Sequence, residues 1–212
     1  MRAIDVAQRS AEVRARIIET AGEVFAERGF AGAGVDEIAR RAGVNKAMLY
    51  YHVGDKETLF GEVVTTNLRR IHAAAASASA AQPLPRERLK AIPRSIAAVV
   101  REHPYVPQLM LREIAAGGPH LPAAALAEMA EIMGLTRATL DDGVRRRVFR
   151  RVDPLVTHLI LVGALMFMAN ALRLKDRFAN TLPLPTTAAS DLESLADLMV
   201  DLALDGIALK KA

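Results

Sequence analysis

Three consecutive residues, Lys46, Ala47 and Met48, carry side chains that can read the edges of DNA bases. A lysine ammonium group can donate to guanine acceptors, and alanine and methionine can make apolar contact with thymine methyl groups. They follow Asn45, whose side-chain oxygen can cap the helix that begins there. The pattern predicts a helix whose first residues point outward and enter a DNA major groove.

The surrounding segment, residues 35–56, predicts a short helix, a tight turn and a second short helix. Gly43 can take the backbone angles that end a helix, and Leu49 would face back toward the first helix. The residues at helical spacing on the inner side of the first helix are Ile38, Ala39 and Ala42. Small Ala39 allows the two helices to approach closely, so the segment predicts a helix-turn-helix.

The run IARRAGVNKAMLYYHVGDKETL, residues 38–59, resembles the DNA-binding domain of the TetR family of transcriptional repressors. The matching positions are Ile38, Ala39, Ala42, Gly43, Val44, Leu49, Tyr50, His52, Lys56, Glu57 and Leu59. The sequence departs from the family pattern at Asn45 (usually Ser), at Val53 (usually Phe) and at Val35 (often Thr). Asn keeps a capping oxygen and Val remains apolar, whereas Val35 lacks a hydroxyl that in the family often reaches a phosphate.

The resemblance implies that Tyr50, Tyr51, His52 and Lys56 touch the DNA backbone or nearby bases. Tyr51 and His52 can donate to phosphate, and Lys56 lies in the first turn of the next helix, where free backbone N–H groups also favour an anion. Core packing of Tyr50 and a plain surface position of Lys46 remain the alternatives. Gly34 or Asp36 can cap the first helix instead of the missing Thr. The candidate DNA-binding residues are Asp36, Asn45, Lys46, Ala47, Met48, Tyr50, Tyr51, His52 and Lys56.

Composition is consistent with a DNA-binding protein but does not require one. Lys and Arg exceed Asp and Glu by 28 − 24 = 4, and there is no cysteine for a disulfide or thiolate site. The histidines lack metal-ligand spacing, and no phosphate loop or nucleophile motif occurs, so we expect no cofactor, no metal and no enzyme. The apolar run 159–169 is shorter than the roughly 20 residues of a membrane span, and the N-terminus lacks a signal-peptide run. We expect a cytoplasmic protein.

The chain as a whole predicts an all-α fold of about nine helices. A three-helix DNA-binding domain, residues 1–54, would precede a larger helical domain for sensing and dimerisation, residues 55–212. The expected helices outside the helix-turn-helix are 10–28, one capped by Asp55, 86–102 interrupted by Pro93, 105–116, 122–142, 154–174 capped by Asp153, and 190–208 with a Ser190–Glu193 capping box.

Two helices could form a dimer interface. Residues 154–174 are apolar on all sides, which a partner chain could cover, although a central helix of the monomer core would look the same. By resemblance, dimerisation would use this helix and residues 190–208. The acidic stripe Glu193, Asp197, Asp201 and Asp205 predicts a solvated flank, or one that pairs with Arg173, Lys175 or Arg177.

The resemblance also implies a small-molecule pocket in the larger domain. The candidate lining residues are Met110, Ile114, Met129, Met133, Phe149, Met166, Phe167 and Asn170. Methionine adapts to irregular ligands but at helical spacing is usually core, and Asn170 needs a polar partner if it is buried. The expected function is a repressor that binds a palindromic operator as a homodimer and is released by a small-molecule effector. The alternatives are a larger domain that binds a protein or no ligand, and activation instead of repression.

Overall fold

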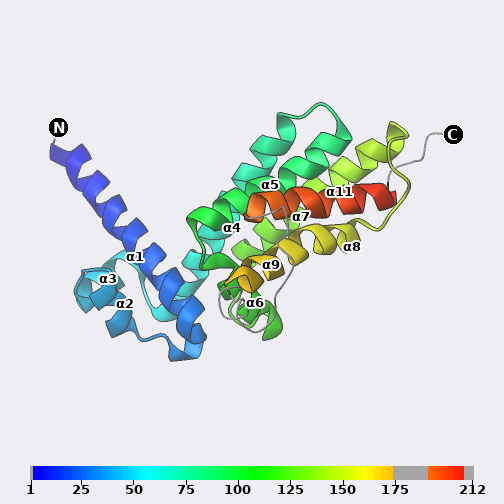
Figure 1. The fold of residues 1–212 in the computed structure, drawn as a ribbon. Helices are drawn as coiled ribbons and strands as arrows, with labels where there is room; N and C mark the ends of the chain where they lie inside the picture. Colours follow the sequence, from blue (N-terminus) through cyan, green and yellow to red (C-terminus); the bar gives the residue numbers. More distant parts are fainter. Residues whose placement is uncertain (1, 174–190, 208–212) are drawn as a thin grey trace. The chain divides into compact units, whose positions relative to one another are not determined.

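The computed structural model describes residues 2–173 and 191–207, with side chains from residue 8 onward, and these residues form helices joined by short connections (Figure 1). The helices up to residue 102 are α1 Arg2–Gly32, α2 Val35–Arg41, α3 Lys46–Val53, α4 Lys56–Ala80 and α5 Pro85–Glu102. They are followed by α6 Val106–Ala115, α7 Ala123–Arg145, α8 Pro154–His158, the π-helical turn η1 Leu159–Gly163, α9 Ala164–Leu172 and α11 Leu192–Ile207. Since α8, η1 and α9 form one continuous helix, the expected all-α fold of about nine helices is confirmed for the described residues.

Helix starts follow the predicted local chemistry. The side-chain oxygen of Asn45 accepts from the backbone N–H of Met48 at 2.8 Å, and Asp55 accepts from Thr58 at 2.8 Å. Asp153 caps α8 in the same way through Val156 at 2.9 Å. The hydrogen bond from the Thr58 backbone lowers the pKa of Asp55, because it stabilises the ionised carboxylate.

Two expectations about helix interiors and ends are corrected. Pro93 does not interrupt α5, which runs through it although proline cannot donate a backbone hydrogen bond; the packing of this helix against α11 holds it together. The last helix is capped by Asp191, which accepts from the Ser194 backbone at 2.7 Å. Ser190, the expected cap, lies outside the described residues.

The chain divides into two compact units. The first unit comprises residues 1–67 and 108–126, and the second comprises 68–107 and 127–212. The first unit is therefore larger than the expected domain 1–54, because it includes the first half of α4, helix α6 and the beginning of α7. Each unit has its own core and is described by itself.

Aromatic residues and helix crossings build the core of the first unit. Gly29, with φ of 70°, ends the regular part of α1 where the sequence predicts, and Phe30 folds back. The rings of Phe25 and Phe60 meet edge to face at 5.0 Å. The buried apolar side chains of this unit include Ile17, Ala21, Val24, Ile38, Leu49, Val53, Leu59 and Val63. The helix-turn-helix thus packs on the apolar face of α1.

The second unit is centred on α5, α7, η1 and α11. Its buried cluster consists of Leu89, Leu140, Phe149, Leu161, Val200, Leu204 and Ile207. The acidic stripe of α11, expected to be solvated or to pair with Arg173, Lys175 or Arg177, also has partners on α5. Three of its members pair with cations of α5, with Glu193 at 3.1 Å from Arg101, Asp197 at 3.7 Å from Arg94 and Asp201 at 2.6 Å from Lys90. Lys175 and Arg177 lie outside the described residues.

The continuous helix Pro154–Leu172 is, in the described part of the chain, long and apolar enough to cross a bilayer by length and composition alone. One face, formed by Thr157, Leu161 and Leu165, packs into the second unit. Within the single chain the helix is therefore not buried on all sides, as a central helix of the monomer core would be. The opposite face is exposed, and its large apolar side chains are Leu155, Val156, Leu159, Ile160 and Phe167.

Candidate nucleic-acid interface

The turn between α2 and α3 has the geometry that the sequence predicts. Gly43 has φ of 66°, a left-handed conformation that most side chains disfavour, and it lets the chain reverse after α2. The backbone N–H of Val44 then donates to the carbonyl of Ala39 at 3.0 Å. Leu49 of α3 is fully buried. Because this side of α3 faces the core, the opposite side of the helix faces outward.

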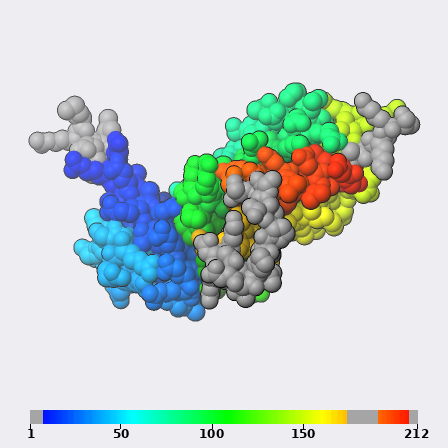
Figure 2. Space-filling model, in the orientation of Figure 1, coloured from blue at the N-terminus to red at the C-terminus, as the bar shows by residue number. Residues whose placement is uncertain are grey.

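The outward side of α3 carries the predicted DNA-reading residues. Lys46, Ala47 and Met48 are exposed at its start, and α2 and α3, in light blue, are uncovered on the face shown in Figure 2. Tyr51 is 84% exposed, and its ring meets His52 edge to face at 5.3 Å. Tyr50 is also exposed, which excludes its alternative interpretation as a core residue.

Arginines on α1 hold the ends of both short helices, a role that was not predicted from the sequence. The Nε of Arg16 donates to the carbonyl of Ala42 at 2.8 Å, at the end of α2, and Arg14 donates to the carbonyl of His52 at 3.3 Å in α3. The last carbonyls of a helix lack partners within the helix, so an arginine in the sequence is a candidate donor to them. Sequence alone does not say which arginine reaches which carbonyl.

Lys56 lies at the start of α4 but its ammonium group does not extend freely into solvent. Its Nζ donates to the carbonyl of Ala31 at 3.3 Å and lies 4.8 Å from the centre of the Phe30 ring. An ammonium group over an aromatic face is attracted by the ring quadrupole. The ammonium group is thereby fixed beside the N-terminus of α4, where a phosphate would be favoured.

Known proteins share this arrangement, in which α3 is the exposed helix of a three-helix domain. The family described as bacterial regulatory proteins, tetR family, matches residues 17–63, which run from α1 into α4. The transcriptional repressor NicS of Pseudomonas putida is 28% identical over 174 residues, which cover 79% of this chain and 80% of NicS. The crystal structure of the TetR-family regulator PfmR from Thermus thermophilus aligns with a TM-score of 0.66 and 28% identity, covering 92% of this chain and 100% of that one. Residues 17–63 thus form a DNA-binding domain of the tetR-family type.

With this domain the chain is a DNA-binding transcriptional regulator, and the relatives and structural neighbours named above are regulators rather than enzymes. The relatives include an activator as well as repressors. The activator FasR of Mycolicibacterium smegmatis is 38% identical over 80 residues, which cover 38% of this chain and 36% of FasR.

An acidic residue pairs with Lys46, the first of the candidate DNA-reading residues. The Nζ of Lys46 lies 2.9 Å from Oδ1 of Asp36, which belongs to the first turn of α2 and is itself exposed. The hydrogen bond and the charge of Asp36 raise the pKa of Lys46. The predicted base contact of Lys46 would require DNA to replace Asp36 as its partner, so we expect this pair to oppose binding.

We therefore expect Asp36→Asn to strengthen binding to a random-sequence duplex by roughly three- to tenfold, because it removes a negative charge and releases Lys46. Fluorescence anisotropy titrations at several salt concentrations would measure the change. In a Lys46→Ala background the same substitution should have a clearly smaller effect. Weaker binding by Asp36→Asn would instead mean that the carboxylate itself contacts DNA.

The eight candidate effector-binding residues of this regulator differ in burial and are divided between the two units. Phe149 is 1% exposed and belongs to the core cluster of the second unit, whereas Phe167 is 66% exposed on the outer face of α9. Met110 is buried and Ile114 exposed, both in the first unit. Met129, Met133, Met166 and Asn170 are partly buried in the second unit. The amide of Asn170 donates to the carbonyl of Met166 at 3.1 Å, a partner within its own helix.

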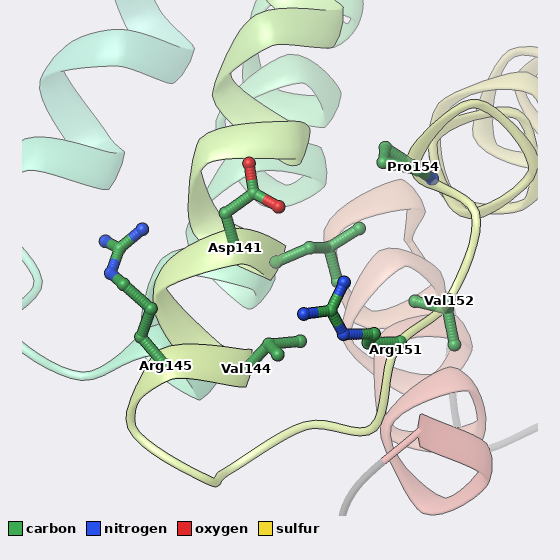
Figure 3. Close-up of a pocket in the computed structure, with 7 residues that line it drawn as sticks. Asp141, Val144, Arg145, Arg151, Val152 and Pro154 are labelled. Atoms are coloured by element: carbon green, nitrogen blue, oxygen red, sulfur yellow. The ribbon is translucent and has the colours of Figure 1, made fainter.

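A pocket of about 370 Å³ opens at the end of α7 (Figure 3). Asp141 and Arg145 come from this helix, and Arg151 extends toward the pocket from the segment that leads to α8. The remaining lining residues are Leu140, Val144, Val152 and Pro154. None of the eight candidate effector-binding residues lines this pocket.

Proposed function

We propose that this regulator is a repressor that binds a palindromic operator as a homodimer and leaves it when a small molecule binds the second unit. The observation that supports this proposal is that one unit has an exposed candidate reading helix and the other unit has an exposed apolar helix face. A single helix-turn-helix contacts few base pairs, and twofold dimers solve this by placing two reading helices one DNA turn apart.

The proposed dimer interface combines two helices that pack side by side in the second unit. We call it the apolar face, and its members are Leu155, Val156, Leu159, Ile160 and Phe167 of the helix Pro154–Leu172 together with Leu198 and Leu202 of α11. Leu198 and Leu202 are four residues apart and lie on a different flank of α11 from the acidic residues that pair with α5. Patches of this kind mark protein contacts.

For the effector we propose an apolar or amphipathic small molecule bound in the second unit. A pocket of about 300 Å³ lies between the end of α5, the end of α9 and the start of α11. Its apolar lining is Val100, Pro104, Ala169, Leu172 and Leu192, and its charged lining is Arg101, Arg173, Asp191 and Glu193. Asn170, one of the candidate ligand residues, is adjacent in sequence to this lining. Repression is favoured over activation because NicS, which matches this chain over 174 residues, is a repressor. A cytoplasmic location follows from the DNA partner.

The test is a selection of bound duplexes from a random-sequence pool, followed by footprinting of the selected site and measurement of the mass of the complex. We expect protection of a palindrome with half-sites about one helical turn apart or slightly more. Apolar carboxylic acids and steroids, added as probes, should reduce protection if the effector class is right. A single unpaired half-site, or no selected sequence, would contradict the dimeric operator proposal.

A further inference from the structure

A contact within the first unit links the α6–α7 connection to Lys56. The ring of His120, which lies between α6 and α7, stacks on Phe30 with a centre separation of 4.0 Å and an angle of 27° between the ring planes. It also meets Phe60 edge to face at 5.6 Å. Phe30 is the ring over which the ammonium group of Lys56 lies. Residues far apart in sequence therefore share one aromatic cluster.

The ring of His120 is held in place by a buried carboxylate. Glu113 of α6 is 5% exposed, and its Oε1 accepts from the backbone N–H of His120 at 2.7 Å. The His120 Nδ1 lies 3.2 Å from the same oxygen, so a proton on Nδ1 is donated to Glu113. A buried carboxylate needs such donors, and here they fix both the backbone and the ring of His120.

Two further contacts join the same segment to α1 and α4. Arg112 donates to the carbonyl of Glu27, at 3.4 Å, near the end of α1. Pro122 packs against Gly61 of α4, where a Cβ would lie 3.3 Å from its ring. The segment 108–126 is thus packed as part of the first unit, and His120 is its contact with Phe30.

We infer that His120 is a positioning residue for DNA binding: fixed by Glu113, its ring holds Phe30, and Phe30 holds the ammonium group of Lys56 where a DNA phosphate binds. The inference rests on the proposed role of Lys56 as a phosphate contact. A lysine side chain has many rotamers, and restraining it before binding reduces the entropy lost on binding. The ammonium group donates to the carbonyl of Ala31, and a lysine, which carries three donors, has donors left for a phosphate.

The experiment compares the salt dependence of binding to a random-sequence duplex, because each phosphate contact contributes about one unit to the slope of log affinity against log salt. Lys56→Ala should reduce the slope by about one and lower the affinity several-fold. His120→Gln, which removes the ring but keeps a polar side chain near Glu113, should do the same. His120→Phe keeps a ring against Phe30 and should bind like the wild type.

The double variant Lys56→Ala/His120→Gln should bind no more weakly than Lys56→Ala alone, since His120 acts through Lys56. Pro122→Ala is the matched control, because it trims the packing of the same segment against Gly61 of α4 and leaves the ring of His120 in place. It should leave the slope unchanged. Circular dichroism and thermal unfolding would establish that each variant is folded.

The outcomes distinguish the positioning role of His120 from the phosphate contact of Lys56. If Lys56→Ala reduces the slope but His120→Gln does not, or if the two effects add, the positioning role of His120 is wrong and the phosphate contact stands. If Lys56→Ala leaves the slope unchanged, both assignments fall. Equal losses in His120→Gln and His120→Phe would mean that the ring is not what positions Lys56, which also overturns the inference.

Discussion

The double substitution Phe167→Glu/Leu202→Glu is expected to convert the regulator into a monomer of 22.9 kDa and to weaken operator binding by roughly 100-fold or more. Both side chains belong to the apolar face, and Leu202 is 68% exposed in the single chain. Burying a large apolar side chain contributes roughly 1.5–3 kcal/mol, and in a twofold interface every member is buried twice. Carboxylates at these positions would have to be desolvated without a cation to pair with.

Mass measurement by light scattering and titration of the selected operator would provide the two readouts. Leu126→Glu is the matched control, since Leu126 is similarly exposed but lies on α7, outside the apolar face. It should leave both the mass and the affinity unchanged. A double variant that remains dimeric would place the interface elsewhere. One that is monomeric but binds the full palindrome with wild-type affinity would contradict the need for a dimer.

Local features of the fold were predictable from sequence because their causes are local. Asn45, Asp55 and Asp153 each cap a helix by bonding a backbone N–H three residues ahead, so spacing alone identifies them. The last helix shows the limit of the same argument. Two adjacent residues, Ser190 and Asp191, could both cap it, and the observed partner is Asp191.

The partners of charged side chains were not predictable, because they come from distant parts of the chain. The acidic stripe of α11 was expected to be solvated or to pair with nearby cations, whereas Asp201 pairs with Lys90 of α5. The exposed position of Lys46 was predicted, but its pairing with Asp36 was not. The positions of DNA-facing side chains follow from a short motif, while their electrostatic environment depends on how the helices pack.

The apolar residues illustrate a second limit. Phe149 and Phe167 both looked suitable for an effector pocket, yet one lies in a core and the other on a surface. An apolar side chain on a helix fits a core, a pocket or an interface equally well, and only the neighbouring helices decide. The expected boundary at residue 54 missed residues 108–126 for the same reason, since their packing on α1 and α4 is not encoded in any local pattern.

Gly143→Ala should lower the free energy of unfolding by about 2 kcal/mol, because a Cβ at this position would overlap the ring of Phe149. Gly143 lies in α7, and an ideal Cβ built on its backbone would lie only 2.0 Å from Cδ2 of Phe149. The ring cannot move away easily, because Phe149 is buried in the core cluster and its backbone N–H donates to the carbonyl of Gly143 at 3.2 Å. The better helix propensity of alanine offsets about 0.5–1 kcal/mol of the overlap.

Gly134→Ala provides a control in the same helix, since no atom lies within 4 Å of its ideal Cβ. This substitution should raise the free energy of unfolding by about 0.5–1 kcal/mol. Chemical denaturation at fixed protein concentration would measure both changes. Combining Gly143→Ala with Phe149→Leu should recover part of the loss, because the smaller side chain relieves the overlap. If both glycine variants raised the free energy of unfolding, or both lowered it, the predicted overlap between a Cβ at residue 143 and the Phe149 ring would be wrong. An increase in both would mean that the packing of this ring against α7 tolerates an alanine at residue 143.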